Sequence, residues 1–304
     1  MSEVLPDPRV GRSPESEPVI LLLPGMTLNG TLMPRFKVDT LAVDFCQFVP
    51  DSPDDRVTMG LYVERLRGTL AAEPLWRRTG QRVVVAHSFG GMLALRWLLE
   101  EAHRSEPDLP DGLVLVATTA GPMYDVLRLR LARLGGRSIR IGLRGLVPLW
   151  NRPLVTRTVK AVLSPSHAQE GRFDFRTLRR PTDFAVDLAG WRNTHWRAMR
   201  GFRLAMRGFD VRDRLRELPI PAIVLHGTDD ALFPRQVGED LARLLPHGRL
   251  RIVEGAGHVL PLTHGDAVVA AVEEMLGRSQ ETGDRRQESD FEGQARSDER
   301  SSAR

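Results

Sequence analysis

Short segments typical of strands, most of them uninterrupted apolar runs, alternate along this chain with segments whose apolar residues recur at helical spacing. The runs lie within residues 18–25, 39–45, 81–87, 111–119, 221–227 and 249–255, and the helical segments within 57–72, 89–104, 236–245 and 264–277. Apolar runs of this length that end at turn residues are typical of strands buried on both faces. Their alternation with helices predicts an α/β fold with a mostly parallel central sheet, right-handed crossovers and flanking helices.

The alternation stops between residues 121 and 218, a stretch that shows helical segments only and is rich in Arg, Leu and Trp. Helices inserted into an open sheet tend to cover the carboxyl ends of its strands, where such folds bind ligands. We therefore expect a helical cap over residues 121–218 and a core of residues 18–120 and 219–279. Residues 1–17 are expected to form a flexible arm and residues 280–304 a disordered, charged tail, because both are poor in apolar surface.

Composition narrows the class of protein. The 304 residues are 41% hydrophobic, which suits a large domain with a substantial core and excludes a wholly disordered chain. The only cysteine, Cys46, has no partner for an intramolecular disulfide. The net charge of +4 comes almost entirely from arginine, and we expect no nucleic-acid partner. No apolar run approaches the ~20 residues that span a bilayer, and the N-terminus lacks a secretory signal, so the prediction is a cytoplasmic protein without membrane insertion.

The most specific motif is AHSFGG at residues 86–91, directly between a predicted strand and a predicted helix. This is the setting of a nucleophile elbow, in which a serine on a tight turn exposes its hydroxyl at the sheet edge in front of a helix N-terminus. Gly90 leaves room where a side chain would collide, and Ala86 replaces the usual first glycine. The alternative is an incidental serine at a helix start. We interpret Ser88 as a nucleophile.

A serine nucleophile needs a base that an acid orients. His258 follows the last predicted strand in the glycine-rich segment EGAGH, and in this topology the base comes last in the chain. His264 is better explained as a helix-start or surface residue, and His87 is expected to point away from the serine. For the acid, Asp229 and Asp230 both follow a predicted strand, and the residues alone leave both open.

Acyl transfer also requires hydrogen-bond donors for the developing oxyanion. One expected donor is the backbone N–H of Phe89, the residue after the serine. The other is the N–H of Met26, in the loop after the first predicted strand, where Gly25 allows a close approach of the backbone. Pro24 has no N–H to offer. The same loop is also explained as a simple turn, and the two explanations are compatible.

With these residues in hand, the chain resembles the α/β-hydrolase superfamily, in the serine esterase and lipase-like branch with a helical cap inserted after the sixth strand. The resemblance covers about residues 18–279 and rests on LLLPGM, AHSFGG, HGTDDALFP and GAGH in that order. The family's acid motif is Gly-x-x-Asp with Pro four residues later; Gly227, Asp230 and Pro234 match it, so the resemblance selects Asp230. In place of the family's common His-Gly, the oxyanion loop has Pro24-Gly25, which weakens the assignment of a substrate.

The predicted cap contributes candidate pocket residues. Trp191, Trp196, Met199 and Phe202 are hypothesised to line an acyl pocket. The simpler alternative is that these side chains pack the cap onto the core while neighbouring arginines reach water.

The leading interpretation is a serine hydrolase that cleaves an ester or thioester of a small to medium apolar acyl compound through an acyl-enzyme. The small-molecule substrate is the expected partner; no metal or organic cofactor motif is present, and the oligomeric state is left open. One alternative is an acyltransferase, C–C hydrolase or cofactor-free oxidative enzyme of the same fold. Another is a non-catalytic ligand-binding or partner-binding protein. Haloalkane dehalogenases and epoxide hydrolases are disfavoured, because they have Asp where this chain has Ser88.

Overall fold

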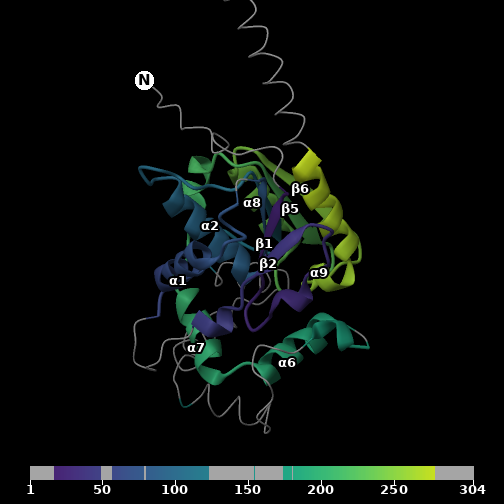
Figure 1. Cartoon of the computed structure of the whole chain (residues 1–304). Helices are drawn as coiled ribbons and strands as arrows, with labels where there is room; N and C mark the ends of the chain where they lie inside the picture. Colours follow the sequence, from purple (N-terminus) through teal and green to yellow (C-terminus); the bar gives the residue numbers. More distant parts are fainter. Residues whose placement is uncertain are drawn as a thin grey trace, which may run out of the picture.

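A single parallel sheet forms the centre of the molecule (Figure 1). The computed structural model describes residues 17–48, 57–78, 80–122, 154, 174–179 and 181–277. The strands are β1 (Val19–Leu23), β2 (Asp39–Ala42), β3 (Arg82–His87), β4 (Gly112–Val116), β5 (Ala222–Gly227) and β6 (Gly248–Val253). Their spatial order is β2-β1-β3-β4-β5-β6, and every neighbouring pair is parallel. The predicted parallel sheet is confirmed.

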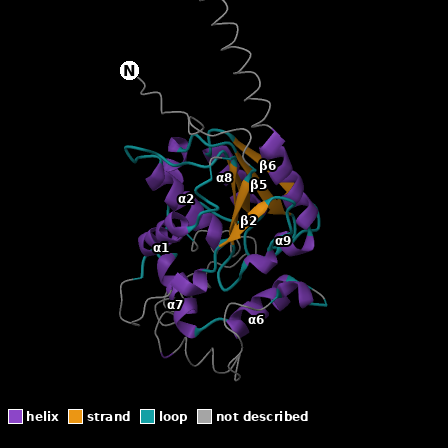
Figure 2. Cartoon of the chain, in the orientation of Figure 1, coloured by secondary structure: helices purple, strands orange, loops and turns teal. Residues whose placement is uncertain are grey.

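Helices cover both faces of this sheet, as Figure 2 shows. They include α1 (Met59–Ala72), α2 (Phe89–Glu101), α8 (Arg235–Leu244), the short α9 (Leu260–Thr263) and a helix over residues 265–277. The odd-numbered residues of β1 pack with α1, α2 and α8, whereas its even-numbered residues pack with the helix over 265–277. Side chains alternate between the faces of a strand, so an uninterrupted apolar strand is stable only when both faces are covered.

Helix starts follow recognisable local signals. Thr58 caps α1, because its Oγ1 accepts a hydrogen bond from the Leu61 N–H at 3.2 Å. Such a cap satisfies one of the N–H groups that lack a partner in the first turn of a helix. Pro234 directly precedes α8, and its fixed φ suits the entry into a helix. Both helices therefore begin within two residues of the starts of the predicted helical segments.

Between β4 and β5 the described residues 174–179 and 181–218 form helical elements and connecting turns. These are η3 (Phe175–Thr177), α6 (Asp183–Asn193), α7 (Trp196–Ala205) and η4 (Arg212–Glu217). Helices α6 and α7 lie beyond one end of the sheet (Figure 1). Most of the remainder of the predicted cap, residues 123–153 and 155–173, lies outside the described residues, as do the predicted arm up to residue 16 and the predicted tail.

In the described part of the chain, four strands precede this segment and two follow it. Residues 1–16 lie outside that part, and the insertion after a sixth strand stays a prediction.

Candidate functional site

Ser88 lies in the turn between β3 and α2, in a backbone conformation that is rare for a residue with a side chain. Its φ is 51° and its ψ is −116°. Strain of this kind persists only where the surrounding structure enforces it. Here the Ser88 N–H donates to the Val116 carbonyl at 3.0 Å, and Thr118 Oγ1 donates to the Ser88 carbonyl at 2.6 Å. The turn is therefore anchored to the end of the neighbouring strand β4.

Two glycines allow the turn to pack this closely. A Cβ atom at Gly90 would lie 2.1 Å from the carbonyl oxygen of Leu23, and one at Gly91 would lie 2.5 Å from Thr118 Oγ1. Both distances are far below van der Waals contact, so a side chain at either position would push α2 away from the sheet. The packing at Gly90 agrees with the space that the sequence motif requires there.

The side chains of Ser88, His258 and Asp230 converge at the carboxyl ends of β3, β6 and β5. Ser88 Oγ lies 3.0 Å from His258 Nε2, and His258 Nδ1 lies 3.0 Å from Asp230 Oδ2. The other carboxylate oxygen of Asp230 accepts hydrogen bonds from the N–H groups of Leu232 and Phe233, each at 2.8 Å. The structure thus brings together the three residues that the sequence singled out as nucleophile, base and acid.

The alternative acid and base lie elsewhere. Asp229 is exposed, and its carboxylate accepts a hydrogen bond from Thr228 Oγ1 at 3.2 Å. His264 Nδ1 lies 2.9 Å from Thr263 Oγ1 at the end of α9. Within the described part of the chain, neither residue forms a hydrogen bond with Ser88 or His258.

Electrostatics around His258 favour its protonated form. Burial by itself would lower the pKa of His258, but the hydrogen bond and charge of Asp230, together with Asp187 and Asp183, raise it above the ordinary value. Burial would raise the pKa of Asp230, yet its hydrogen bonds to His258 and to the Phe233 N–H lower it overall. An ionised carboxylate that accepts from Nδ1–H leaves Nε2 free to take a proton from the serine.

The two predicted oxyanion donors are the N–H of Met26, in the turn after β1, and the N–H of Phe89, the first residue of α2. Among the described residues, the N–H groups of Met26 and Phe89 have no hydrogen-bond acceptor. Thr27, directly after Met26, has a φ of 62°, and its carbonyl accepts a hydrogen bond from Thr194 Oγ1 at 3.3 Å. Both N–H groups are thus available to an acceptor, and their role stays a prediction.

The predicted pocket residues lie on α6 (Trp191) and on α7 (Trp196, Met199 and Phe202), and they fall in two kinds of surroundings. Met199 and Phe202 are fully buried. The Phe202 ring centroid lies 5.0 Å from that of Phe89, in an edge-to-face arrangement, and 5.8 Å from that of Tyr62. Phe202 is thus part of the hydrophobic core beside the residue that follows Ser88, as the simpler alternative expects.

The two tryptophans are partly exposed. The guanidinium carbon of Arg203 lies 5.4 Å from the centroid of the Trp191 ring, and that of Arg197 lies 5.7 Å from the Trp196 ring. Arginines stacked on aromatic faces in this way gain a cation–π attraction, and burial lowers the pKa of Arg203 to about 10. That these tryptophans line an acyl pocket remains a hypothesis.

Sequence reasoning missed one residue at this site and one contact of another. Asp183, the first residue of α6, accepts hydrogen bonds from the N–H groups of His258 and Val259. His87, which we expect to point away from the serine, bonds through Nε2 to the His258 carbonyl at 2.9 Å. The only local signal at Asp183 is its place after the helix-capping Thr182, and that signal does not indicate contact with a residue 75 positions later.

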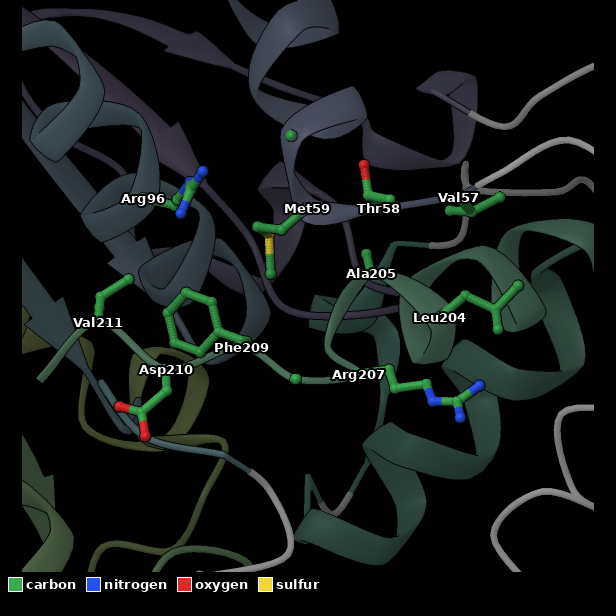
Figure 3. A pocket seen from close by; sticks show the side chains of 12 residues that line it. Val57, Thr58, Met59, Arg96, Leu204, Ala205, Arg207, Phe209, Asp210 and Val211 are labelled. Atoms are coloured by element: carbon green, nitrogen blue, oxygen red, sulfur yellow. The ribbon is translucent and has the colours of Figure 1, made fainter.

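A hollow of about 470 Å³ lies among the start of α1, α2 and the chain that follows α7 (Figure 3). Its lining includes the largely buried Met59, Phe209 and Val211 and the more exposed Arg96 and Arg207. None of Ser88, Asp230 and His258 lines it. The hollow is therefore separate from the Ser88 site.

The described residues show neither a cluster of metal ligands nor a helix suited to a membrane. Over that part of the chain, no three or more His, Cys, Asp or Glu side chains gather as the ligands of a metal ion would. None of the helices found there combines the length and apolar character needed to cross a membrane.

Comparison with known proteins gives a consistent result. A family model described as "Alpha/beta hydrolase family" matches residues 20–271. The chain is 24% identical over 284 residues to the "Magnesium-chelatase 30 kDa subunit" of Rhodobacter capsulatus, which covers 88% of this chain and 89% of that protein. It is 25% identical over 264 residues to the "Pimeloyl-[acyl-carrier protein] methyl ester esterase" of Vibrio atlanticus, covering 82% and 91%. Other curated relatives match through segments that span only 3% to 29% of their own length.

Solved structures share the fold. One of them, a thermophilic esterase from Thermogutta terrifontis, superposes with a TM-score of 0.53 at 21% identity. The superposition covers 86% of this chain and 90% of that one.

Proposed function

Because the chain belongs to the alpha/beta hydrolase family, we propose that it is a serine hydrolase cleaving an ester or thioester of a small to medium apolar acyl compound. The observation that carries the proposal is the continuous line of contacts from Ser88 Oγ through His258 to Asp230, with both distances at 3.0 Å. A hydroxyl alone is a weak nucleophile, and an adjacent base that is itself oriented by a carboxylate activates it.

The reaction begins at the elbow. Ser88 Oγ attacks the acyl carbonyl carbon while its proton passes to His258 Nε2. Asp230 keeps the hydrogen of the imidazole on Nδ1 and stabilises the imidazolium that forms. The oxygen of the tetrahedral intermediate is held by the N–H groups of Met26 and Phe89, and the helix N-terminus of α2 favours the same negative charge.

The second half restores the enzyme. His258 Nε2 returns its proton to the leaving alcohol or thiol as the bond from the acyl carbon to that group breaks. Water then attacks the acyl-enzyme and gives a proton to His258. When the bond between the acyl carbon and Ser88 Oγ breaks, that proton returns to Ser88 and the carboxylic acid is released.

The preference for an ester rests on the named relatives. A protein 25% identical over most of its length is called a methyl ester esterase, and a structural neighbour is an esterase. A thioester has the same carbonyl geometry and a better leaving group, so the same residues would serve it. The acyl pocket is assigned only by the hypothesis on Trp191 of α6 and on Trp196, Met199 and Phe202 of α7.

A fluorophosphonate probe together with p-nitrophenyl esters of graded chain length tests the proposal. The wild type should be labelled and should hydrolyse at least one ester, whereas Ser88→Ala should lose labelling and about 10³-fold or more in kcat. Ser105→Ala, at an exposed serine after α2, is the matched control and should behave as the wild type. Equal labelling of the wild type and Ser88→Ala would contradict the mechanism.

A second candidate is a protein that acts by binding a partner. It is favoured by the relative described as a magnesium-chelatase subunit, which matches 88% of this chain. Such a protein has no need of a serine activated by a histidine and a carboxylate. A Ser88→Ala variant that keeps every cellular phenotype of the wild type would favour this candidate over the hydrolase.

A further inference from the structure

The backbone of His258 is held from two sides. Its N–H donates to Asp183 Oδ2 at 2.8 Å, and the next N–H, of Val259, donates to Asp183 Oδ1 at 2.9 Å. On the other side, the His258 carbonyl lies 2.9 Å from Nε2 of His87, which is fully buried. Since the carbonyl can only accept, Nε2 of His87 carries the hydrogen. The peptide groups that orient the imidazole are thus bound by two side chains from distant parts of the chain.

The loop is shaped to receive the Asp183 carboxylate. A Cβ atom at Gly257 would lie 2.7 Å from each carboxylate oxygen, so only glycine leaves room for this contact. Asp183 is not required to cap α6, because Thr182 Oγ1 already accepts from the Ala185 N–H at 3.3 Å. Hydrogen bonds between backbone N–H groups and an ionised carboxylate are stronger than neutral ones. The contact is therefore directed at the histidine loop rather than at its own helix.

The same helix also reaches the predicted oxyanion loop. A Cβ atom at Gly190 would lie 2.6 Å from Thr27 Oγ1, and Thr194, just after α6, donates to the Thr27 carbonyl. A small hydrophobic cluster joins the two contacts: Val186 and Ala189 of α6 pack with residues of both loops, Leu28 and Val259 among them. Helix α6 thus touches the loop that carries the base and the loop that carries a proposed oxyanion donor.

We propose that Asp183 is a positioning residue, which holds the backbone of His258 so that the imidazole is in place for Ser88 only when α6 is docked on the core. This inference rests on the proposed function, because it assigns Asp183 a part in the chemistry of that same site. It makes the docking of α6 a requirement for the base. A displacement of about 1 Å at a reacting group is enough to cost up to 10²-fold in rate.

Charge gives the proposal a second readout. The described titratable groups that act electrostatically on or with His258 are Asp230, Asp183, Asp187, His87 and His226. The carboxylates raise the pKa of His258, so removing the Asp183 charge should lower it. Because His258 must be neutral to accept the serine proton, the acid limb of the rate profile should then move to lower pH.

The experiment measures kcat, KM and the pH dependence of kcat/KM for Asp183→Ala and Asp183→Asn on the best p-nitrophenyl ester. Asp183→Ala should lower kcat about 10- to 100-fold with a much smaller change in KM. Asp183→Asn keeps one acceptor oxygen, so its kcat should lie between those of the wild type and Asp183→Ala. The acid limb of its kcat/KM profile should be shifted to lower pH. Thermal unfolding followed by circular dichroism confirms that each variant is folded; if Asp183→Ala is not, Asp183→Asn carries the test.

Two control variants distinguish the hydrogen bonds of Asp183 to the His258 backbone from the effect of its charge and from a general disturbance of α6. Asp187, on the same helix, is a second carboxylate that raises the pKa of His258. Asp187→Asn should therefore shift the acid limb of kcat/KM to lower pH and leave kcat at its pH-independent maximum unchanged. Phe184→Ala, at an exposed side chain beside Asp183, should change neither.

Two results would overturn the inference while leaving the proposed function intact. The first is a wild-type kcat in both Asp183 variants, with Ser88 still labelled. The second is a lowered kcat with an unmoved acid limb in Asp183→Asn, which would indicate a merely structural role. Absence of labelling in the wild type would instead overturn the proposed function.

Discussion

The elbow around Ser88 and the loop around His258 meet in one site but are held in different ways. The elbow is held by the hydrogen bond from the Ser88 N–H to the Val116 carbonyl, by that from Thr118 Oγ1 to the Ser88 carbonyl, and above all by the absence of side chains at Gly90 and Gly91. The histidine loop is held by side chains, those of Asp183 and His87, and its imidazole by Asp230. The first arrangement depends on volume and the second on charge and hydrogen bonding, so the two should fail under different perturbations.

The largest effect should come from breaking the charge pair on the histidine side. Asp230→Asn presents an amide where Nδ1–H needs an acceptor, which disfavours the required tautomer and should lower kcat about 10⁴-fold. Asp229→Asn alters an exposed neighbour and should stay within about two-fold of the wild type, as surface substitutions do. Steady-state kinetics on one ester compare them; equal losses in both variants would show that Asp230 has no special role.

A substitution that disrupts the elbow should instead lower the free energy of unfolding. Gly90→Ala places a Cβ 2.1 Å from the Leu23 carbonyl oxygen, and overpacking of this kind costs about 1–3 kcal/mol of unfolding free energy or more. Gly68→Ala is the matched control, because nothing lies within 4 Å of its Cβ in the middle of α1. It should raise stability by about 0.5–1 kcal/mol. Urea unfolding measures both, and a neutral Gly90→Ala would contradict the steric account.

The smallest effect should appear in the pH profile. The pKa of His258 is raised by nearby carboxylates, so the acid limb of kcat/KM should have its midpoint above the ordinary histidine value of about 6.5. Because Asp187 is exposed, added salt should screen its charge and move the midpoint down by less than about one pH unit. A limb at or below the ordinary value, or one that rises with salt, would contradict this electrostatic description.

The strands and the candidate nucleophile and base, Ser88 and His258, were predictable because their signals are local. β1, β3 and β5 are continuous apolar runs that end at turn residues, and the AHSFGG segment combines a strand end, a serine and glycines within six residues. His258 could be singled out because the glycine-rich segment that carries it directly follows a strand. Between Asp229 and Asp230 the residues alone did not decide, since adjacent side chains on a loop differ only in the direction that the folded turn gives them.

Other features had no local signal. The burial of Phe202 against Phe89 depends on how α7 packs, and an amphipathic helix in the sequence does not tell which apolar residues meet the core and which meet a ligand. The contact of Asp183 with the His258 loop joins residues from two segments that share no motif. The link from His87 to the His258 carbonyl likewise depends on the approach of two strand ends.

Sequence by itself therefore determined the parallel sheet, the helices that cover it and the identity of the candidate nucleophile and base. Periodic burial and tight turns are properties of neighbouring residues, so they can be read along the chain. The residues alone left Asp229 and Asp230 open, and the family resemblance selected Asp230. Only the tertiary structure decided which side chains hold the loop that carries His258. Those contacts form between segments far apart in the chain, and their directions are set by packing that no short stretch contains.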